Sequence, residues 1–147
     1  MKSEVAEKYN NFRDGVEIVN IEIRKLSLNK TGNPEEKGYK TLIFGFKNES
    51  SRYEKISTSL LGVFQDMIFT IFEMKEKDEK TKKSIFDLKV TFYLLFKTKE
   101  KIDDEIFDLF VKNDIPVKIH PYFREVVSNM LMRAGLPAIT IPIYENT

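Results

Sequence analysis

The sequence has no cysteine and no tryptophan, and its 147 residues include a single histidine, His120. Without cysteine, neither a disulfide framework nor a thiolate metal site can form. A zinc site needs three or four ligands, so one imidazole beside Pro121 is typical of a structural or exposed residue rather than of a metal ligand. We therefore expect no bound metal and no cofactor.

Motifs that carry chemistry are also missing. The sequence contains no phosphate-binding glycine loop, no zinc-ligand spacing and no nucleophile elbow. Asp103-Asp104-Glu105 is acidic but lacks the alternating oxygen ligands and the glycine of a calcium loop. Asp66 is a carboxylate within an apolar segment, which is compatible with a shifted pKa and a function. We expect it instead at an edge or in a loop, and no second carboxylate or nucleophile has a motif relation to it. The sequence predicts no catalytic residue and no enzyme.

Long hydrophobic runs and an excess of one charge are absent as well. No apolar run reaches the roughly 20 residues that a membrane span requires, and the N-terminal residues MKSEVAEKYNNFRDG lack the apolar stretch of a signal peptide. The 24 Lys and Arg residues nearly balance the 23 Asp and Glu residues, which gives a net charge of +1. Nucleic-acid binders usually present a basic surface. We expect a cytoplasmic protein with no membrane span and no nucleic-acid partner.

Phenylalanine, by contrast, is abundant. The chain has 12 phenylalanines and 6 tyrosines. Aromatic side chains supply large apolar areas to protein cores and are enriched where proteins contact other proteins. The composition is therefore compatible both with a core packed with phenylalanine and with an apolar surface that binds another polypeptide.

Strand patterns fill the first two thirds of the chain. In the segment that begins at Val16, the apolar positions change phase after Ile23, which predicts a bulge near Arg24-Lys25. Further strands are expected at about residues 39–48, within 59–75, and over 84–98, where apolar residues alternate without a break.

Polar connections at residues 48–51 and 76–83 are too short for crossover helices, so we expect the strands to pair antiparallel. The segment 59–75 is apolar on both faces and must be covered on both sides. One helical layer covers one side, and a second copy of the chain is the simplest candidate for the other. Residues 1–15 form an N-terminal arm or short helix, and residues 16–147 form a single domain.

The strongest helix pattern lies at residues 121–134. Pro121 suits the first turn of a helix, and Gly135 followed by Pro137 is a complete stop signal. The acidic residues 103–105 suit the start of a shorter helix just before it. An apolar stripe at helical spacing predicts the side that packs on the sheet or on a second chain, formed by Phe123, Val126, Val127, Met130 and Leu131.

The residues around this helix resemble the C-terminal motif of the SecB preprotein-translocase chaperones. That family carries Pro-Tyr-Ala-Arg-Glu at the start of the helix and Arg-Gly-x-x-Pro at its end. Phe123 stands where the family usually has Ala. The matching positions are Pro121, Tyr122, Arg124, Glu125, Arg133, Gly135 and Pro137.

The resemblance implies an α+β fold, in which a four-stranded antiparallel sheet carries the helix 121–134 on one face and the chains assemble as dimers or dimers of dimers. It also implies a molecular chaperone that holds unfolded or extended polypeptides in apolar, aromatic-lined grooves. The sequence does not decide which face of the sheet is open. We predict that clients contact the sheet aromatics that the helix leaves free, chiefly Phe44, Phe46, Phe64, Phe72, Phe92 and Phe96.

Two functional alternatives stay open. The SecB family docks a translocation motor on an acidic sheet surface, and this chain is close to neutral, so we do not expect motor docking. A specialised relative that serves an antitoxin or a mobile element fits at least as well as an export chaperone. The alternative from another class is an assembly or adaptor domain that binds one specific folded partner through the same sheet.

Overall fold

The protein folds as an antiparallel sheet with helices on one side of it. The computed structural model describes residues 3–32, 40–75, 79–137 and 139, and of Lys40, Thr41 and Glu79 only the backbone. The element order is α1 (Ser3–Gly15), β1 (Glu17–Lys30), β2 (Lys40–Lys55), β3 (Leu60–Lys75), the 3-10 turn η1 (Glu79–Thr81), β4 (Lys83–Lys97), α2 (Asp104–Asn113) and α3 (Ile115–Arg133). The expected α+β fold with a four-stranded antiparallel sheet is confirmed.

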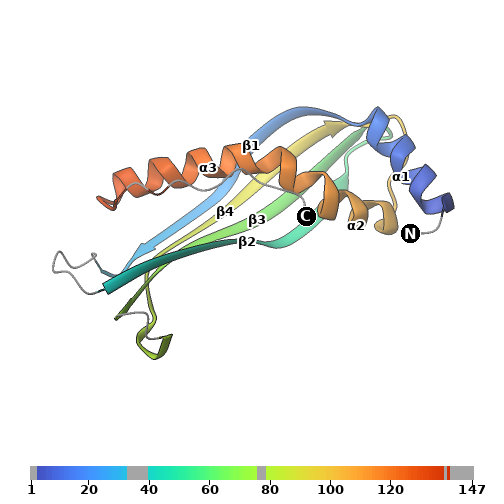
Figure 1. The fold of residues 1–147 in the computed structure, drawn as a ribbon. Coiled ribbons are helices and arrows are strands. Elements are labelled where there is room, and N and C mark those ends of the chain that lie inside the picture. Colours follow the sequence, from blue (N-terminus) through green and yellow to red (C-terminus); the bar gives the residue numbers. More distant parts are fainter. Residues whose placement is uncertain (1–2, 33–39, 76–78, 138, 140–147) are drawn as a thin grey trace.

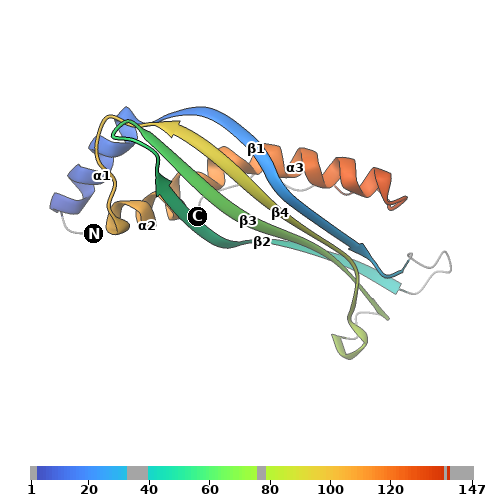
Figure 2. The same ribbon diagram turned by 180° about the vertical axis from the view of Figure 1, so that it is seen from behind.

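The sheet has the strand order β1-β4-β3-β2, so β1 and β2 are its edges. The longest helix, α3, runs along one face of the sheet, and α1 and α2 lie at one end (Figure 1). Seen from behind, the opposite face carries none of the described helices (Figure 2). We call these two sides the helix face and the open face.

The inner strands supply most of the hydrophobic core. Alternate side chains of β4 point to the helix face and are at most 1% exposed, which confirms the alternation read from the sequence: Phe86, Leu88, Val90, Phe92, Leu94 and Phe96. Five apolar side chains of β3 on this face are at most 2% exposed: Leu61, Val63, Met67, Phe69 and Ile71. Burial of these two rows against α3 holds the layers together.

The edge strands differ in part from the expectation. A register shift between Ile23 and Lys25 confirms the predicted bulge, and a second shift follows Ile18. The polar residues 48–51 were expected to connect two strands, but they continue β2, with a bulge at Glu49. They stay in the strand because Ser50 and Ser51 bond to side chains of β3. Of the predicted loop 76–83, residues 76–78 lie outside the described residues.

Helix α3 begins six residues earlier than the sequence pattern suggested, at Ile115 rather than Pro121. Pro116 occupies the first turn, where no amide hydrogen is required. Pro121 lies inside the helix and leaves the carbonyl of Val117 without its usual donor. That loss is tolerated because Val117 is 50% exposed and its turn faces solvent. None of the described helices is long and apolar enough to cross a bilayer.

The end of α3 follows the predicted stop signal. Gly135 has a φ of 69°, the left-handed conformation that favours glycine. The amide of Leu136 donates to the carbonyl of Leu131 at 3.0 Å, and the amide of Gly135 donates to that of Met132 at 3.2 Å, which is a Schellman motif. The Lys30 ammonium donates to the Ala134 carbonyl at 2.7 Å and ties the end of β1 to the helix.

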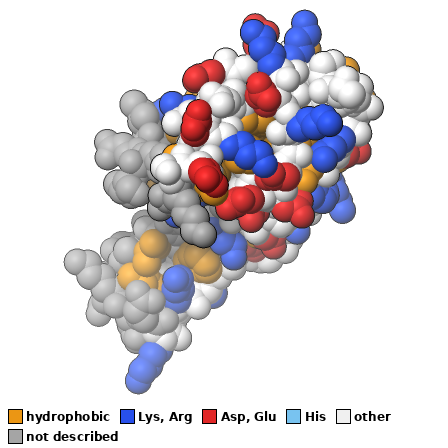
Figure 3. Space-filling model, turned by 90° about the vertical axis from the view of Figure 1, so that its right-hand side faces the viewer, with side chains coloured by type: hydrophobic (Ala, Val, Ile, Leu, Met, Phe, Trp, Pro, Cys, Tyr) orange, Lys and Arg blue, Asp and Glu red, His pale blue; other side chains and the backbone are white. Residues whose placement is uncertain are grey.

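Helices α1 and α2 close one end of the core. Phe12 of α1 is 1% exposed, and its ring packs edge-on against Phe110 of α2 with centroids 5.3 Å apart. Asp103 caps α2 by accepting a hydrogen bond from the Ile106 amide at 2.9 Å, and it also pairs with Lys8 of α1. Acidic and basic side chains are interleaved over this end of the molecule (Figure 3). The helix expected near residues 103–105 is therefore present and tied to α1.

Removing the ring of Phe92 should destabilise the fold strongly. Phe92 is 1% exposed beneath α3, so Phe92→Ala leaves a cavity and is expected to cost about 3–5 kcal/mol of unfolding free energy. Phe44→Ala on the same face is the matched control, because Phe44 is already 36% exposed, and it should cost about 1–2 kcal/mol. Urea unfolding followed by circular dichroism measures both, and equal losses would contradict this assignment of the core.

Candidate functional site

Two rows of exposed apolar side chains flank α3 on the helix face. The β1 stripe pairs with core residues of β4, and the β2 stripe pairs with residues of β3 on the same face. Exposure is between 36% and 46% in both rows. The β1 stripe consists of Ile18, Ile23, Leu26 and Leu28, and the β2 stripe consists of Leu42, Phe44 and Phe46.

A groove of about 370 Å³ separates α3 from β1. Ile23 and Phe92 of the sheet line it on one side, and Tyr122 and Val126 of the helix line it on the other. Tyr122 is 47% exposed, so its ring is available at the rim. The groove can hold an apolar side chain from another polypeptide, because most of its wall is hydrophobic.

On the other side of α3, the β2 stripe forms an aromatic row with the helix. The ring of Phe46 lies 5.4 Å from that of His120 and 6.1 Å from that of Phe123, and Phe44 lies 5.9 Å from Phe69. His120 is 3% exposed, which favours the structural role expected for it. Phe44 and Phe46 therefore have one side packed on the core and the other side open to solvent.

The strand β2 is also fixed to α2 near its far end. The Tyr53 hydroxyl donates to Asp104 at 2.6 Å, and its ring lies 4.3 Å from that of Phe107. This hydrogen bond to a carboxylate, together with burial and the charge of Asp104, raises the pKa of Tyr53 to about 12. The phenol therefore stays protonated and keeps this contact over the whole physiological pH range.

The structure distributes the six predicted client-binding phenylalanines over three environments. Phe44 and Phe46 lie on the helix face and are exposed. Phe92 and Phe96 are 1% and 0% exposed and belong to the core. Phe64 and Phe72 are half-buried on the open face. The alternation in the sequence identifies the two faces, but it does not show which positions α3 covers.

The residues of the helical apolar stripe face the sheet. Phe123, Val127 and Leu131 are at most 1% exposed, and Val126 and Met130 pack partly buried against the core. The residues of the C-terminal motif have no common site. Within or just after α3, Pro121, Tyr122, Glu125, Arg133, Gly135 and Pro137 are exposed, and Arg124 is half-buried.

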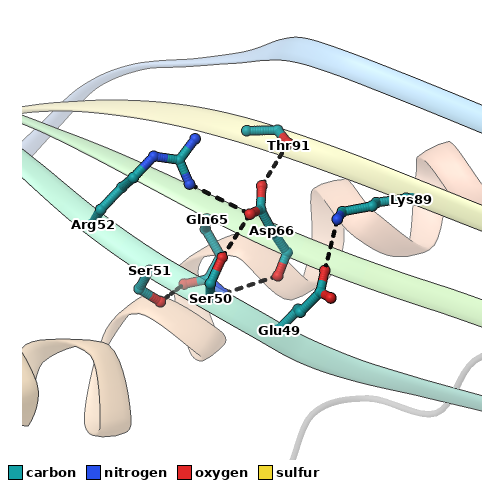
Figure 4. Close-up of polar contacts among 8 residues, drawn as sticks. All are labelled: Glu49, Ser50, Ser51, Arg52, Gln65, Asp66, Lys89 and Thr91. Atoms are coloured by element: carbon teal, nitrogen blue, oxygen red, sulfur yellow. Dashed lines mark hydrogen bonds and ion pairs between the residues drawn. The ribbon is translucent and has the colours of Figure 1, made fainter.

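A polar cluster occupies the middle of the open face (Figure 4). The Asp66 carboxylate on β3 accepts hydrogen bonds from Ser50 at 2.6 Å and from Thr91 at 2.5 Å, and its Oδ2 atom lies 3.3 Å from Arg52. These partners come from the strands on either side. The expectation that Asp66 lies at an edge or in a loop is wrong, because neighbouring strands supply the donors that a half-buried carboxylate needs.

The pKa of Asp66 reflects these contacts. Burial acts to raise its pKa, but the hydrogen bonds from Ser50 and Thr91 and the charge of Arg52 outweigh burial and lower it below the usual range. Lys89 and Glu49 form a further ion pair beside the cluster at 3.1 Å. The cluster links β2, β3 and β4 through side-chain contacts. The described residues contain no group of side chains that could hold a metal ion.

Comparison with solved structures shows that the fold is similar to that of a known chaperone. The solved structure of the SecB-like chaperone Rv1957 of Mycobacterium tuberculosis, in complex with a ChAD peptide from the Rv1956 HigA1 antitoxin, matches 97% of this chain and 98% of that chain with a TM-score of 0.72. The chain has a SecB-like fold. The two sequences are 16% identical, so the likeness concerns the fold alone.

A second solved structure is only distantly similar. A protein of unknown function from Streptococcus agalactiae matches with a TM-score of 0.38 and 6% identity, over 86% of this chain and 96% of that chain, which is too distant for any inference. No family model and no curated protein matches the sequence.

Replacing the Asp66 carboxylate should give a pH-dependent loss of stability. Because the pKa of Asp66 is lowered in the folded protein, its contribution is present at neutral pH. That contribution is lost as the pH falls through the ordinary carboxyl pKa, about 3.9, towards the lower folded value. Asp66→Asn should therefore cost about 1–3 kcal/mol at neutral pH, and the difference from wild type should shrink in acid.

Urea unfolding at a series of pH values measures this difference. Asp108→Asn is the matched control, because Asp108 is an exposed residue of α2, and its effect should be small at every pH. A difference between wild type and Asp66→Asn that stays constant down to acidic pH would contradict the role assigned to the charged carboxylate.

Proposed function

We propose that the protein is a SecB-like molecular chaperone that binds unfolded or extended polypeptide on its helix face. The observation that carries the proposal is the pair of exposed apolar stripes beside α3. Seven large apolar side chains that are more than a third exposed, on one face of a small domain, are the kind of surface that marks a protein-binding site.

Client binding is assigned mainly to the β2 stripe. Phe44 and Phe46 present rigid aromatic rings that are held from behind by Phe69, His120 and Phe123, so little side-chain entropy is lost on binding. The outer edge of β2 pairs with no other strand in the described part of the chain. An extended client can therefore add backbone hydrogen bonds at this edge while its alternate side chains contact the aromatic rings.

The binding is passive under this proposal. Burying one large apolar client side chain contributes about 1.5–3 kcal/mol before entropy is subtracted, so several shallow contacts along the stripe give micromolar rather than irreversible binding. No nucleotide is required for release. A client leaves when it folds or when another partner takes its exposed segment.

The structural neighbour supports a polypeptide as the binding partner. That SecB-like chaperone was solved in complex with a ChAD peptide from an antitoxin, which supports the proposal that this chain also binds a polypeptide. We infer that the present protein works in a bacterial cytoplasm and serves unfolded clients, either in export or as a specialised antitoxin-type or mobile-element relative.

Self-association is assigned to the β1 stripe. Its side chains are aliphatic, its strand edge is unpaired within the described residues, and the groove beside Tyr122 lies next to it. Pairing of two copies through this region would cover Ile23, Leu26 and Leu28 and leave the β2 stripe of each copy free. The proposal therefore separates an assembly edge from a client edge.

A charge placed in the β2 stripe should abolish client binding. Phe44→Asp puts a carboxylate where a client's apolar side chain would be desolvated, so affinity for a reduced, denatured protein such as reduced α-lactalbumin should fall at least about tenfold. Ile56→Asp is the matched control, because Ile56 is 48% exposed but lies in the turn that leads to β3. Fluorescence titration and suppression of client aggregation measure the effect.

Two results would count against the proposed function. Equal client binding by Phe44→Asp and wild type would remove the β2 stripe from the client site. Failure of the wild-type protein to bind any of several unrelated denatured proteins would favour the adaptor alternative, in which one folded partner is recognised.

A charge placed in the β1 stripe should reduce the oligomeric state. Ile23 is 46% exposed on the helix face, and Ile23→Asp would force two carboxylates into a shared apolar interface. Light scattering should show a lower mass for this variant than for wild type. Ser27→Asp changes the opposite face of the same strand and should keep the wild-type mass. A wild-type monomer would disprove the assignment of β1 to assembly.

A further inference from the structure

The open face contains a hollow that the helix-face function does not use. It has a volume of about 470 Å³ and lies between β2, β3 and β4. Gly45 provides its floor, and a Cβ atom built at Gly45 would meet no atom within 4 Å. Ile68 and Phe72 of β3 form apolar walls. The hollow exists because Gly45 has no side chain, whereas Lys47, Ile68 and Phe72 around it have large ones.

Of the charged side chains around the hollow, the carboxylate has hydrogen-bond partners and the two lysines have no ion-pair partner in the described residues. Its carboxylate, Asp87, accepts hydrogen bonds from Thr70 at 3.1 Å and from Ser84 at 2.7 Å. Lys47 also lines the hollow, and Lys82 lies with its Nζ atom 4.3 Å from the centre of the Phe72 ring. Within the described part of the chain, neither lysine has an ion pair.

The neighbouring charges do not supply a partner for these lysines. Glu49 is paired with Lys89, and Asp66 is held by Ser50, Thr91 and Arg52. Among the described residues, these carboxylates of the open face already have donors, whereas Lys47 and Lys82 at the hollow have no carboxylate partner. The local charge is complementary to a ligand that carries negative charge next to an apolar group.

We propose that this hollow docks an acidic segment of a partner polypeptide, with one apolar side chain between Ile68 and Phe72 and flanking carboxylates paired with Lys47 and Lys82. A basic segment is disfavoured, because it would approach two unpaired lysines to reach one carboxylate that is already hydrogen-bonded. The site lies on the face opposite the stripes, so this proposal does not depend on the chaperone function.

The structure offers a substitution that fills the hollow without disturbing the fold. Gly45→Val adds a side chain into open space on a strand, and valine suits a strand better than glycine does. The variant should therefore unfold at the same urea concentration as wild type or a higher one. Lys47→Glu combined with Lys82→Glu changes the charge at the rim and leaves the hollow open.

The test uses a peptide in which a central phenylalanine is flanked by aspartates, with both ends blocked, and two counterparts with asparagine or lysine in place of aspartate. Amide NMR spectra of the wild-type protein should shift at Gly45, Thr70 and Asp87 when the aspartate peptide is added. The asparagine peptide should bind about 2- to 30-fold more weakly, since two exposed ion pairs are lost. Gly45→Val should abolish the shifts, and the double lysine variant should weaken binding by a similar factor or more.

Several outcomes would overturn the proposal. NMR shifts confined to the helix face would place the peptide elsewhere, and unchanged peptide binding by Gly45→Val would exclude the hollow. Tighter binding of the lysine peptide would instead assign the hollow to a basic segment. Binding of denatured client by Gly45→Val should equal that of wild type. Loss of peptide binding with retained client binding separates this site from the proposed chaperone site, and failure of one proposal leaves the other testable.

Discussion

An α-helix with its side chains is about 10 Å wide, whereas four strands at spacings of about 4.8 Å span about 14 Å between their outer backbones. The single long helix α3 therefore covers β3 and β4 and leaves the edge strands partly uncovered. The fully buried side chains lie on the inner strands, and the exposed apolar ones lie on β1 and β2 of the same face. This mismatch in width produces both the core and the candidate binding surface from one alternating pattern.

The aromatic rings on the two faces of the sheet have different surroundings. On the open face the aromatic rings lie under cations: Arg24 is 4.2 Å from the ring of Tyr93, and Arg52 is 4.8 Å from the ring of Phe64. The Asp66 cluster adds satisfied polar groups between them. On the helix face, Phe44 and Phe46 have no such cover in the described structure. The helix face therefore offers bare aromatic rings, whereas the open face presents its aromatic rings together with charged side chains.

Much of the fold could be predicted from the sequence where one periodicity dominates. The unbroken alternation of β4, the phase change at Arg24 and the stop signal at Gly135 each have one physical interpretation, and the structure has all three. The predicted bounds of strands and helices were wrong where contacts with distant residues override the local conformational preference of the sequence. Residues 48–51 have the composition of a loop, but hydrogen bonds from Ser50 to Asp66 and from Ser51 to Gln65 keep them in β2. Pro121 has the local features of a helix start, but the helix already begins at Ile115, with Pro116 in its first turn.

For the candidate site, the sequence indicated an apolar, aromatic surface but not which residues form it. The excess of phenylalanine indicates an aromatic surface or an aromatic core, and the chain contains both. Phe92 and Phe44 occur in similar apolar alternations, and the position of α3 alone makes one a core residue and the other a surface residue. The hollow at Gly45 has no signal in the sequence, because it depends on the side chains of the neighbouring strands.

The bulges in both edge strands carry a consequence for behaviour at high concentration. A long, flat, apolar edge would template the growth of an unlimited sheet. Register shifts after Ile18 and Ile23 in β1, and at Glu49 in β2, divide each edge into short runs. An incoming strand can match β1 over residues 20–23 or 25–30, and β2 over residues 40–48 or 50–55, before its hydrogen bonds fall out of step at a bulge. Interruptions of this kind oppose continuous edge-to-edge growth, and both edges stay open to a partner of limited length.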